Sequence, residues 1–401
     1  MKVLFLLNGL THYFNSVLNQ LNNKEEIEII VVSPSTAQET VGKGVYQTTI
    51  GINFKIYQCK EVNRFYRKKF FNSFEQILDT EKPEVIVFIW PYILEMVFNP
   101  ILLLKIKRKK IKIIFKDIPF QLQPFNDAIK LRSFPFIDEN QTLKGVSLIE
   151  KINNLVVAII RRYYYSFIDL NLLYIEDGLR KLESYGVPSK KIAITLNSPD
   201  TDHLIEAKKK SILLEEILPE NPFRIIHVGR LVKWKRVDLL IEAIAKLISL
   251  FNRIELVVIG GGPELNNLKT LAKKLNVEDR IIFVGSVYDP VLLGQYFYSS
   301  SIYVLAGMGG LSINEAMVFE KPIICSICDG TERTLVKDGY NGYFFDNGNL
   351  NSLIEKLILL LSDQKLIEKF GKNSFQIIQD KVNINTVVQN YYKAFLSINN
   401  C

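Results

Sequence analysis

Short apolar runs alternate with longer amphipathic segments along this chain of 401 residues. Early examples of such runs are Val3–Leu7, Ile27–Val32 and Val85–Trp90. A strand buried on both faces is apolar throughout, whereas a half-exposed strand alternates apolar and polar side chains. Continuous apolar runs separated by helical segments therefore predict parallel sheets with helices on both faces. The fold class that we expect is α/β.

The alternation occurs twice, which predicts two doubly wound, Rossmann-like domains that face each other across a cleft. We place the first domain at residues 1–200 and the second at residues 201–380, with a tail helix within residues 381–401. The segment Asn197–Asp200 is the expected hinge. The polar stretch Pro119–Gly145 is too long for an ordinary connection, so we expect it to be functional or mobile and to border the cleft.

Composition points to an ordinary globular protein, with 48% hydrophobic and 23% charged residues. The apolar start Met1–Leu7 is too short for a signal peptide, because Asn8 and Gly9 interrupt it. The longest apolar stretch, Val85–Phe98, is too short to span a bilayer. We therefore expect a cytoplasmic protein.

Cysteine and histidine spacing predicts no metal site. Cys325 and Cys328 form a C-x-x-C pair, but no second pair completes a zinc motif, and Cys325 ends an apolar run typical of a buried thiol. The histidines are too widely spaced to act together: His12, His203 and His227. We expect neither a metal nor another cofactor.

The net charge of +8 is partly clustered. Six cations lie in the eight residues Lys105–Lys112, and Arg64–Phe71 mixes cations with aromatic side chains. An anionic membrane surface would attract both segments, which would place the protein peripherally at the inner face of a membrane. A solvated helix end and loop is the alternative. Nucleic acid is not an expected partner, because no recognition module accompanies the charge.

Two strand-to-helix turns carry the candidate site. After the apolar run Phe223–Val228 come Gly229, Arg230 and, five positions later, Lys235. Arg230 offers a planar fork to phosphate oxygens, and Lys235 a compact point charge. The alternative, two surface cations at a helix start, opposes the helix dipole. The two cations are our candidates for catalysis. A diphosphate that leaves a substrate gains negative charge during the reaction, and fixed cations would stabilise that charge.

The second turn follows the run Ile302–Ala306 and contains a glycine pair, a helix start and a carboxylate. Glycine lets the backbone approach a ligand closely, and helix N–H groups bind phosphate oxygens. Glu315, about one turn into the helix, would accept hydrogen bonds from both ribose hydroxyls. Favourable placement near a helix N-terminus is the alternative for Glu315. The candidate substrate-binding residues of the two turns are Gly229, Gly309, Gly310, Leu311, Ser312 and Glu315.

These segments resemble the C-terminal signature of the family-4 glycosyltransferases, which are retaining enzymes with the GT-B fold. The resemblance runs over roughly Asn197–Phe345 and is loose in the N-terminal half. It implies that Arg230 and Lys235 grip the diphosphate of a nucleotide-sugar donor and that Glu315 holds the ribose. It also implies a saccharide or lipid-linked acceptor, a transfer that needs no metal, and a tail helix that crosses back to the N-terminal domain.

One position departs from the family pattern. The family usually has a second glutamate, facing the transferred sugar, eight positions before the first, and here that position is Gly307. A glycine-rich turn of this kind resembles a bacterial capsule and O-antigen subset, and we expect Gly307 to leave room beside the sugar. The departure keeps one other function open, a non-catalytic GT-B subunit that binds a partner glycosyltransferase. A sugar-nucleotide epimerase is the third alternative, and it would need carboxylates and histidines in the cleft for acid and base chemistry.

The N-terminal half adds three candidates that follow apolar runs. Gly9 and His12 come after Val3–Leu7, where they would contact donor phosphate or acceptor. Asp117 follows Lys112–Lys116 and is the best-placed carboxylate for activating an acceptor hydroxyl. A capping role in the turn is the alternative for Asp117.

Overall fold

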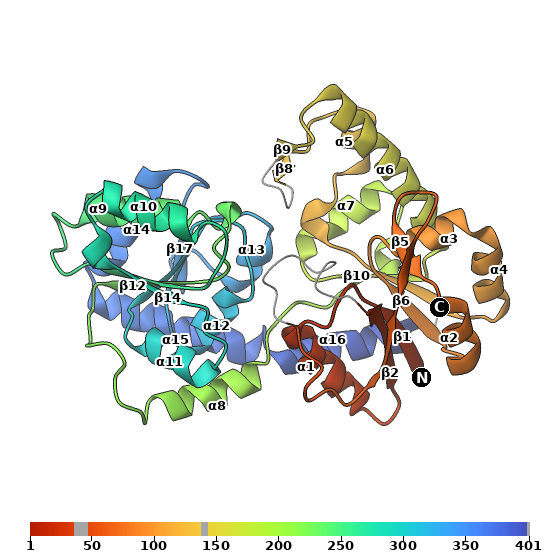
Figure 1. Ribbon diagram of the computed structural model, residues 1–401, viewed down its shortest axis with the longest axis horizontal. Coiled ribbons are helices and arrows are strands. Elements are labelled where there is room, and N and C mark those ends of the chain that lie inside the picture. Colours follow the sequence, from red (N-terminus) through yellow and green to blue (C-terminus); the bar gives the residue numbers. More distant parts are fainter. Residues whose placement is uncertain (36–46, 138–142, 399–401) are drawn as a thin grey trace. The chain divides into compact units, whose positions relative to one another are not determined.

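The computed structural model describes residues 1–35, 47–137 and 143–398, and it divides into two compact units. Unit 1 contains Met1–Leu196 and Asn385–Cys401, and unit 2 contains Asn197–Ile384. Each unit is an α/β domain built on a parallel sheet (Figure 1).

Unit 1 contains a seven-stranded parallel sheet. Its central strands β1 and β6 are buried except for Lys2 at the start of β1, because helices cover both faces, as their continuous apolar sequences predicted. Phe5 in β1 pairs with Val31 of β2 on one side and Val87 of β6 on the other. In spatial order the strands are β11 (Ile192–Ile194), β10 (Leu170–Leu173), β7 (Lys112–Lys116), β6 (Val85–Phe88), β1 (Lys2–Leu6), β2 (Glu28–Pro34) and β3 (Lys55–Cys59).

The helices of unit 1 include the last helix of the chain. Phe395 of that helix contacts Phe5 of β1 with ring centroids 6.1 Å apart, so the helix packs against the N-terminal sheet. The helices are α1 (His12–Asn22), α2 (Phe74–Glu81), α3 (Leu94–Phe98), α4 (Pro100–Arg108), α5 (Phe125–Ile129), α6 (Leu148–Phe167), α7 (Leu179–Ser184) and α16 (Ile384–Ser397). Two short antiparallel hairpins accompany them, β4 (Glu61–Asn63) with β5 (Lys69–Phe71), and β8 (Phe136–Ile137) with β9 (Leu143–Lys144).

Two segments of unit 1 differ from a simple strand and helix alternation. The apolar stretch after β6 contains two helices, because Asn99 ends α3 and its side chain accepts a hydrogen bond from Leu102 N (3.1 Å) to start α4. The stretch Pro119–Gly145 contains α5 and the β8–β9 hairpin, while residues 138–142 lie outside the described residues.

Unit 2 contains a six-stranded parallel sheet. In spatial order its strands are β14 (Ile281–Gly285), β13 (Glu255–Ile259), β12 (Arg224–Val228), β15 (Ile302–Leu305), β16 (Ile323–Cys325) and β17 (Gly342–Phe344). Its helices are α8 (Thr201–Ser211), α9 (Val237–Leu247), α10 (Leu265–Lys274), α11 (Pro290–Tyr298), α12 (Ser312–Val318), α13 (Thr331–Leu335), α14 (Leu350–Leu361) and α15 (Gln364–Asp380). Strands β12 and β15 are neighbours, so the two candidate turns leave adjacent strands.

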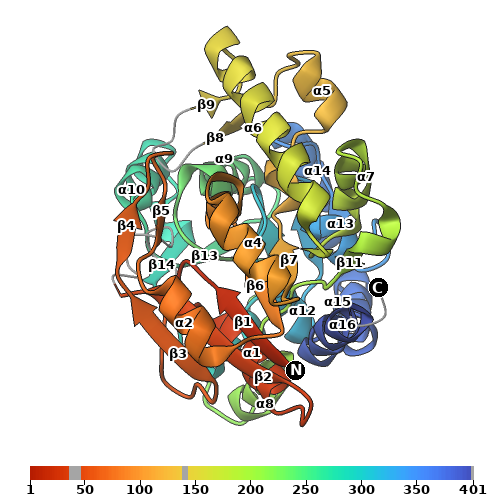
Figure 2. The same cartoon turned by 90° about the vertical axis from the view of Figure 1, so that its right-hand side faces the viewer.

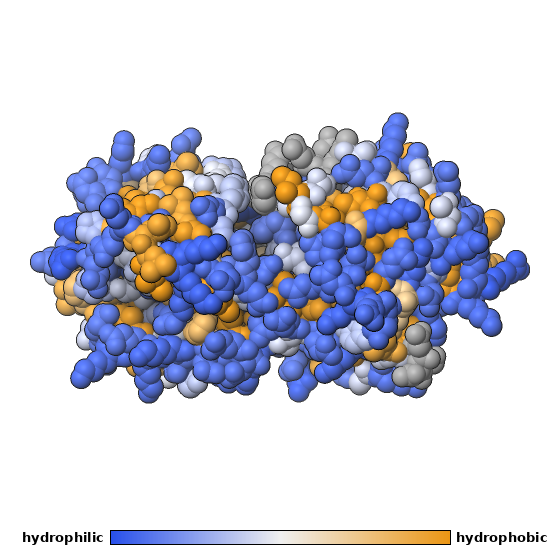
Figure 3. Space-filling model, turned by 90° about the horizontal axis from the view of Figure 1, so that it is seen from below, coloured by the Kyte–Doolittle hydropathy of each residue, from blue (hydrophilic) through white to orange (hydrophobic). Residues whose placement is uncertain are grey.

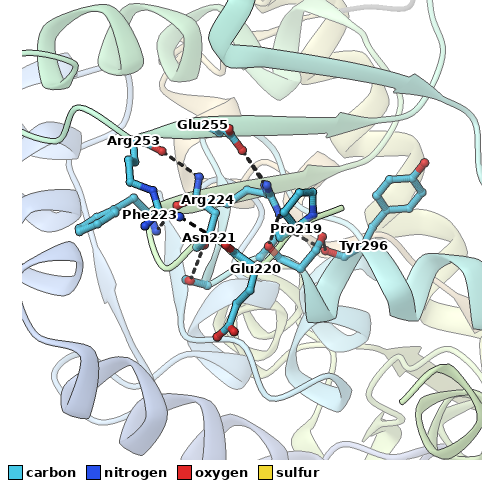
Figure 4. A network of polar contacts seen from close by, with 11 residues as sticks. Pro219, Glu220, Asn221, Phe223, Arg224, Arg253, Glu255 and Tyr296 are labelled. Carbon is cyan, nitrogen blue, oxygen red and sulfur yellow. Dashed lines mark hydrogen bonds and ion pairs between the residues drawn. The ribbon is translucent and has the colours of Figure 1, made fainter. Parts of the chain in front are cut away.

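A buried polar network anchors the amino end of β12 (Figure 4). The Arg224 side chain is 3% exposed and forms an ion pair with Glu255 at the start of β13 (2.8 Å). It also donates to the carbonyl oxygens of Pro219 and Ser299, both at 2.7 Å. A buried guanidinium is stable only when its donors are used in this way. The network therefore fixes the strand whose other end leads into the site.

Apolar patches lie among mainly polar surface on both units in the face that Figure 3 shows. Within the described parts of the chain, no helix has the length and apolar character needed to cross a membrane. Cys325 is a buried free thiol at the end of β16, as its sequence context predicted, and burial raises its pKa.

Candidate functional site

The first turn of the site follows β12 and is packed backbone to backbone against the turn after β13. Gly229 N donates to Ile259 O (2.9 Å), and Leu231 N donates to Gly261 O (2.9 Å). A Cβ on Gly260 would lie 1.8 Å from Gly229 O, so only glycine fits there. Glycines at 260 to 262 therefore support the turn that carries Arg230 and Lys235.

Lys235 of the first turn reaches the glycine pair of the second. It lies in a short 3-10 helix, Lys233–Lys235, and is 6% exposed. Its Nζ donates a hydrogen bond to Gly309 O, and a Cβ on Gly310 would lie 3.0 Å from that Nζ. Burial, together with the smaller effect of nearby Arg230, lowers the pKa of Lys235 to about 8. The structure thus brings Lys235, Gly309 and Gly310 together, with the partly exposed Arg230 close by.

The second turn follows β15 and leads into α12. Glu315 lies in the first turn of α12, partly exposed, and burial raises its pKa to about 7 despite the opposing effect of Lys235. A carboxylate that has lost water without gaining donors behaves in this way. The arrangement leaves Glu315 ready to accept hydrogen bonds from ligand hydroxyls.

Leu311 and Ser312 define the start of α12, but this helix start offers weaker phosphate-binding groups than the sequence suggested. Leu311 is the N-cap residue without a side-chain cap, and the Ser312 hydroxyl accepts a hydrogen bond from Tyr303 OH (2.7 Å). The helix has seven residues, so its dipole is small. Lys235 rather than the helix start is the main positive group at the glycine pair.

Gly307 is not beside open space, which corrects the expectation that it leaves room for a sugar. A Cβ at this position would lie 1.9 Å from Trp234 O and 2.8 Å from the carbonyl carbon of Lys235. Met308 N donates to the same Trp234 oxygen (2.9 Å). The absent side chain lets the two turns touch, and this contact holds Lys235 against Gly309.

Two carboxylates that our sequence reasoning missed lie on the other side of Gly309. Asp329 lies in the loop after β16, the next strand of the sheet, and Glu332 lies in the first turn of α13. A Cβ on Gly309 would lie 3.0 Å from Glu332 Oε1 and 3.1 Å from Asp329 Oδ2. Glu332 is fully buried, and burial together with Asp329 raises its pKa to about 7. The acidic residues that follow a third strand at the same sheet edge were the available signal.

His227 of β12 lies directly beneath the first turn. It is fully buried, and burial lowers its pKa to about 4, so the ring is neutral near pH 7. Its Nδ1 donates to Val304 O (3.0 Å), and its Nε2 lies 3.5 Å from where a Gly229 Cβ would be. No described group bonds this nitrogen.

The N-terminal candidates lie in unit 1 at the carboxyl ends of their strands. Gly9 is buried in the turn after β1, and His12 is exposed at the start of α1. Asp117 follows β7, but its carboxylate forms an ion pair with Arg161 (3.0 Å) and accepts hydrogen bonds from Tyr165 OH and from Ile118 N (2.8 Å). These contacts correct the acceptor-activating role that we expected, and they support the capping alternative.

Comparisons with known proteins place unit 2 in a family. Residues 209–377 match Glycosyl transferases group 1. A Staphylococcus aureus poly(ribitol-phosphate) alpha-N-acetylglucosaminyltransferase is 26% identical over 43% of this chain and 35% of its own length. An N-acetylgalactosamine-N,N'-diacetylbacillosaminyl-diphospho-undecaprenol 4-alpha-N-acetylgalactosaminyltransferase of Campylobacter jejuni is 27% identical over 57% of this chain and 61% of its own length. The chain therefore matches only part of these relatives.

Solved structures show the fold over the whole chain. The Anabaena protein HepE, solved in complex with UDP, covers 99% of this chain with a TM-score of 0.68 at 14% identity, and all of HepE is matched. The predicted GT-B fold class, with two Rossmann-like domains, is confirmed. Residues 209–377 thus match the group 1 glycosyltransferases, and the proteins that this chain is similar to include capsule and lipid-linked glycosyltransferases of bacteria, as the motif resemblance indicated.

Proposed function

We propose that this protein is a retaining glycosyltransferase that moves a sugar from a nucleotide-sugar donor to a saccharide or lipid-linked acceptor in surface polysaccharide biosynthesis. The observation that carries the proposal is the meeting of Lys235 with Gly309 and Gly310, with Glu315 one helical turn away. A buried cation, a glycine pair and a carboxylate that accepts from no donor among the described residues match the parts of a nucleoside diphosphate. The acceptor class follows the printed names of the relatives.

Arg230 and Lys235 would hold the diphosphate, and Glu315 would hold the ribose. As the bond between the anomeric carbon and the phosphate oxygen breaks, negative charge grows on the diphosphate. Fixed cations in a site of low polarity stabilise that charge strongly, which is the work of a metal ion in other transferases. The acceptor oxygen bonds to the anomeric carbon on the same face, and its proton passes to the leaving phosphate.

The test is release of nucleoside diphosphate from a panel of nucleotide-sugars with and without acceptors. Arg230→Ala and Lys235→Ala should each lose on the order of 3–5 kcal/mol of transition-state stabilisation. Lys233→Ala is the matched control, because Lys233 lies in the same turn but is exposed. Turnover should persist in a chelator. Wild-type turnover in both cation variants would refute the diphosphate assignment.

One observation favours a second candidate, a non-catalytic subunit that binds a partner glycosyltransferase. The position that usually carries the sugar-facing glutamate is Gly307, whose Cα is closed off by Trp234 O. Tight nucleoside diphosphate binding without turnover on any donor and acceptor pair would favour this candidate.

A further inference from the structure

The loop after β16 brings two carboxylates to the glycine pair that Lys235 contacts. Helix α13, which follows this loop, lies next to α12 in unit 2 (Figure 2). Gly330 has a φ of +93°, a conformation that favours glycine, and it turns the chain sharply between Asp329 and Glu332. Both acidic side chains face the same point, because a Cβ on Gly309 would lie 3.0–3.2 Å from Glu332 Oε1 and from the two oxygens of Asp329.

Glu332 is the inner member of this pair. It is fully buried, and its Oε2 accepts a hydrogen bond from Gly330 N (3.0 Å). Its Oε1, which faces Gly309, is bonded by no described group. A buried polar atom without a partner costs free energy, and such atoms are typical of functional sites rather than of loops that only support a fold.

Asp329 is the outer member of the pair and is partly exposed. Its Oδ1 accepts a hydrogen bond from Thr331 N (2.8 Å), which fixes the orientation of the side chain. The other oxygen, Oδ2, lies 3.1 Å from the position of a Gly309 Cβ and is bonded by no described group. Asp329 therefore presents one oriented carboxylate oxygen at the glycine pair.

The diphosphate assignment indicates which ligand group would meet this oxygen. Lys235 Nζ donates to Gly309 O, so a diphosphate held by Lys235 would lie close to the same glycine. The transferred sugar is covalently bonded to that diphosphate and must lie next to it. A carboxylate repels an anionic diphosphate, but it is a strong hydrogen-bond acceptor for the hydroxyls of a neutral sugar.

We propose that Asp329, with Glu332 behind it, holds the transferred sugar by accepting a hydrogen bond from one of its hydroxyls. The inference rests on the proposed function and deepens it, since it assigns the sugar contact of the same site. Asp329 would supply the carboxylate that cannot be placed at Gly307, where a Cβ would meet Trp234 O. A hydroxyl that reaches Asp329 Oδ2 would then be a feature by which the protein selects its donor.

Calorimetry separates the sugar contact from the diphosphate contact. UDP-glucose, UDP-N-acetylglucosamine, UDP-galactose and GDP-mannose are each titrated beside the free nucleoside diphosphate. Asp329→Ala should weaken binding of the nucleotide-sugar that the wild type binds most tightly about ten- to a hundredfold, the usual loss for a hydrogen bond to a charged group. Binding of the free diphosphate should stay equal or tighten, because the variant removes a nearby negative charge. A merely structural role would weaken both ligands.

Two variants serve as controls. Asp289 follows β14 of the same sheet and makes the same kind of contact, accepting from the N–H two residues on, Val291 N (2.9 Å). Asp289→Ala should therefore bind both ligands as the wild type does. Asp329→Asn keeps an oxygen for Thr331 N but loses the charge. It should lose only about three- to tenfold in nucleotide-sugar affinity, because a charge-assisted hydrogen bond is roughly twice as strong as a neutral one.

Three results would overturn the sugar contact: equal nucleotide-sugar affinity in Asp329→Ala and the wild type, equal losses for both ligands, or the same selective loss in Asp289→Ala. Wild-type binding of a free diphosphate without binding of any nucleotide-sugar would also refute the contact, and it would leave the diphosphate assignment in place. A wild type that binds none of the nucleoside diphosphates would instead refute the proposed function, and the sugar contact with it.

Discussion

Lys235 should make nucleoside diphosphate binding weaker at alkaline pH, so that a plot of affinity against pH has a descending alkaline limb. Burial lowers its pKa from 10.5 to about 8, which disfavours the empty site's ammonium by roughly 3 kcal/mol relative to water. A bound diphosphate reverses this loss, so binding takes up a proton above pH 8. With a pKa near 8, the ammonium fraction falls from about nine tenths at pH 7 to about one tenth at pH 9. Affinity should therefore weaken about tenfold between these values, or roughly 1.4 kcal/mol.

Calorimetry with the nucleoside diphosphate at pH 7 and 9 measures this limb directly. Lys235→Arg should flatten it, because a guanidinium stays charged throughout this range. Lys233→Arg, in the same turn but exposed, should leave it in place. A wild-type affinity that does not change between pH 7 and 9 would refute the reasoning, as would an unchanged limb in Lys235→Arg.

Three other results are expected. Glu315→Ala should weaken nucleoside diphosphate binding about ten- to a hundredfold in calorimetry, through loss of roughly 1.5–3 kcal/mol from charged hydrogen bonds; equal affinity would remove the ribose role. Gly307→Ala should lower both the unfolding midpoint and nucleotide affinity, because its Cβ would lie 1.9 Å from Trp234 O; unchanged binding would contradict the contact between the turns. The pKa of Glu332 is about 7 in the folded protein and 4.5 when the side chain is exposed. Its protonated form therefore contributes folding stability that is fully present below pH 4.5 and is lost as the pH rises through 7. Glu332→Gln should reduce that loss in denaturant unfolding at pH 5 and 8, and an identical pH dependence would argue against it.

Elements with strong local signals could be predicted from the sequence. Strand β7 coincides with its apolar run, and β12 and β15 lie within theirs, Phe223–Val228 and Ile302–Ala306. The elements that sequence reasoning missed are polar or short. Helix α8 has the polar sequence TDHLIEAKKKS, and its only clear signal is Asp200, which caps the helix by accepting from His203 N (3.1 Å).

The site shows the same division between local and tertiary information. Lys235, Gly309 and Glu315 were found because each follows an apolar strand in a recognisable motif. The burial of Glu332 behind Gly309 depends on how the residues after a third strand, β16, pack against the second turn, and a local pattern does not give that packing. Gly307 was misinterpreted because an absent side chain indicates either space for a ligand or contact with backbone. Only the position of Trp234 O distinguishes the two.

The placement of α16 in unit 1 has a consequence for how the chain folds during its synthesis. All of unit 2 lies between Leu196 and Asn385, so it is complete before the last element of unit 1 is made. At about 5–20 residues per second, translation of this interval takes roughly ten to forty seconds. During that time Phe5 and Phe14 lack the aromatic partners that Phe395 and Tyr391 later supply. Of the two units, unit 1 is thus the first to be started and the last to be finished, and its β1 face lacks the packing of α16 until unit 2 has been made.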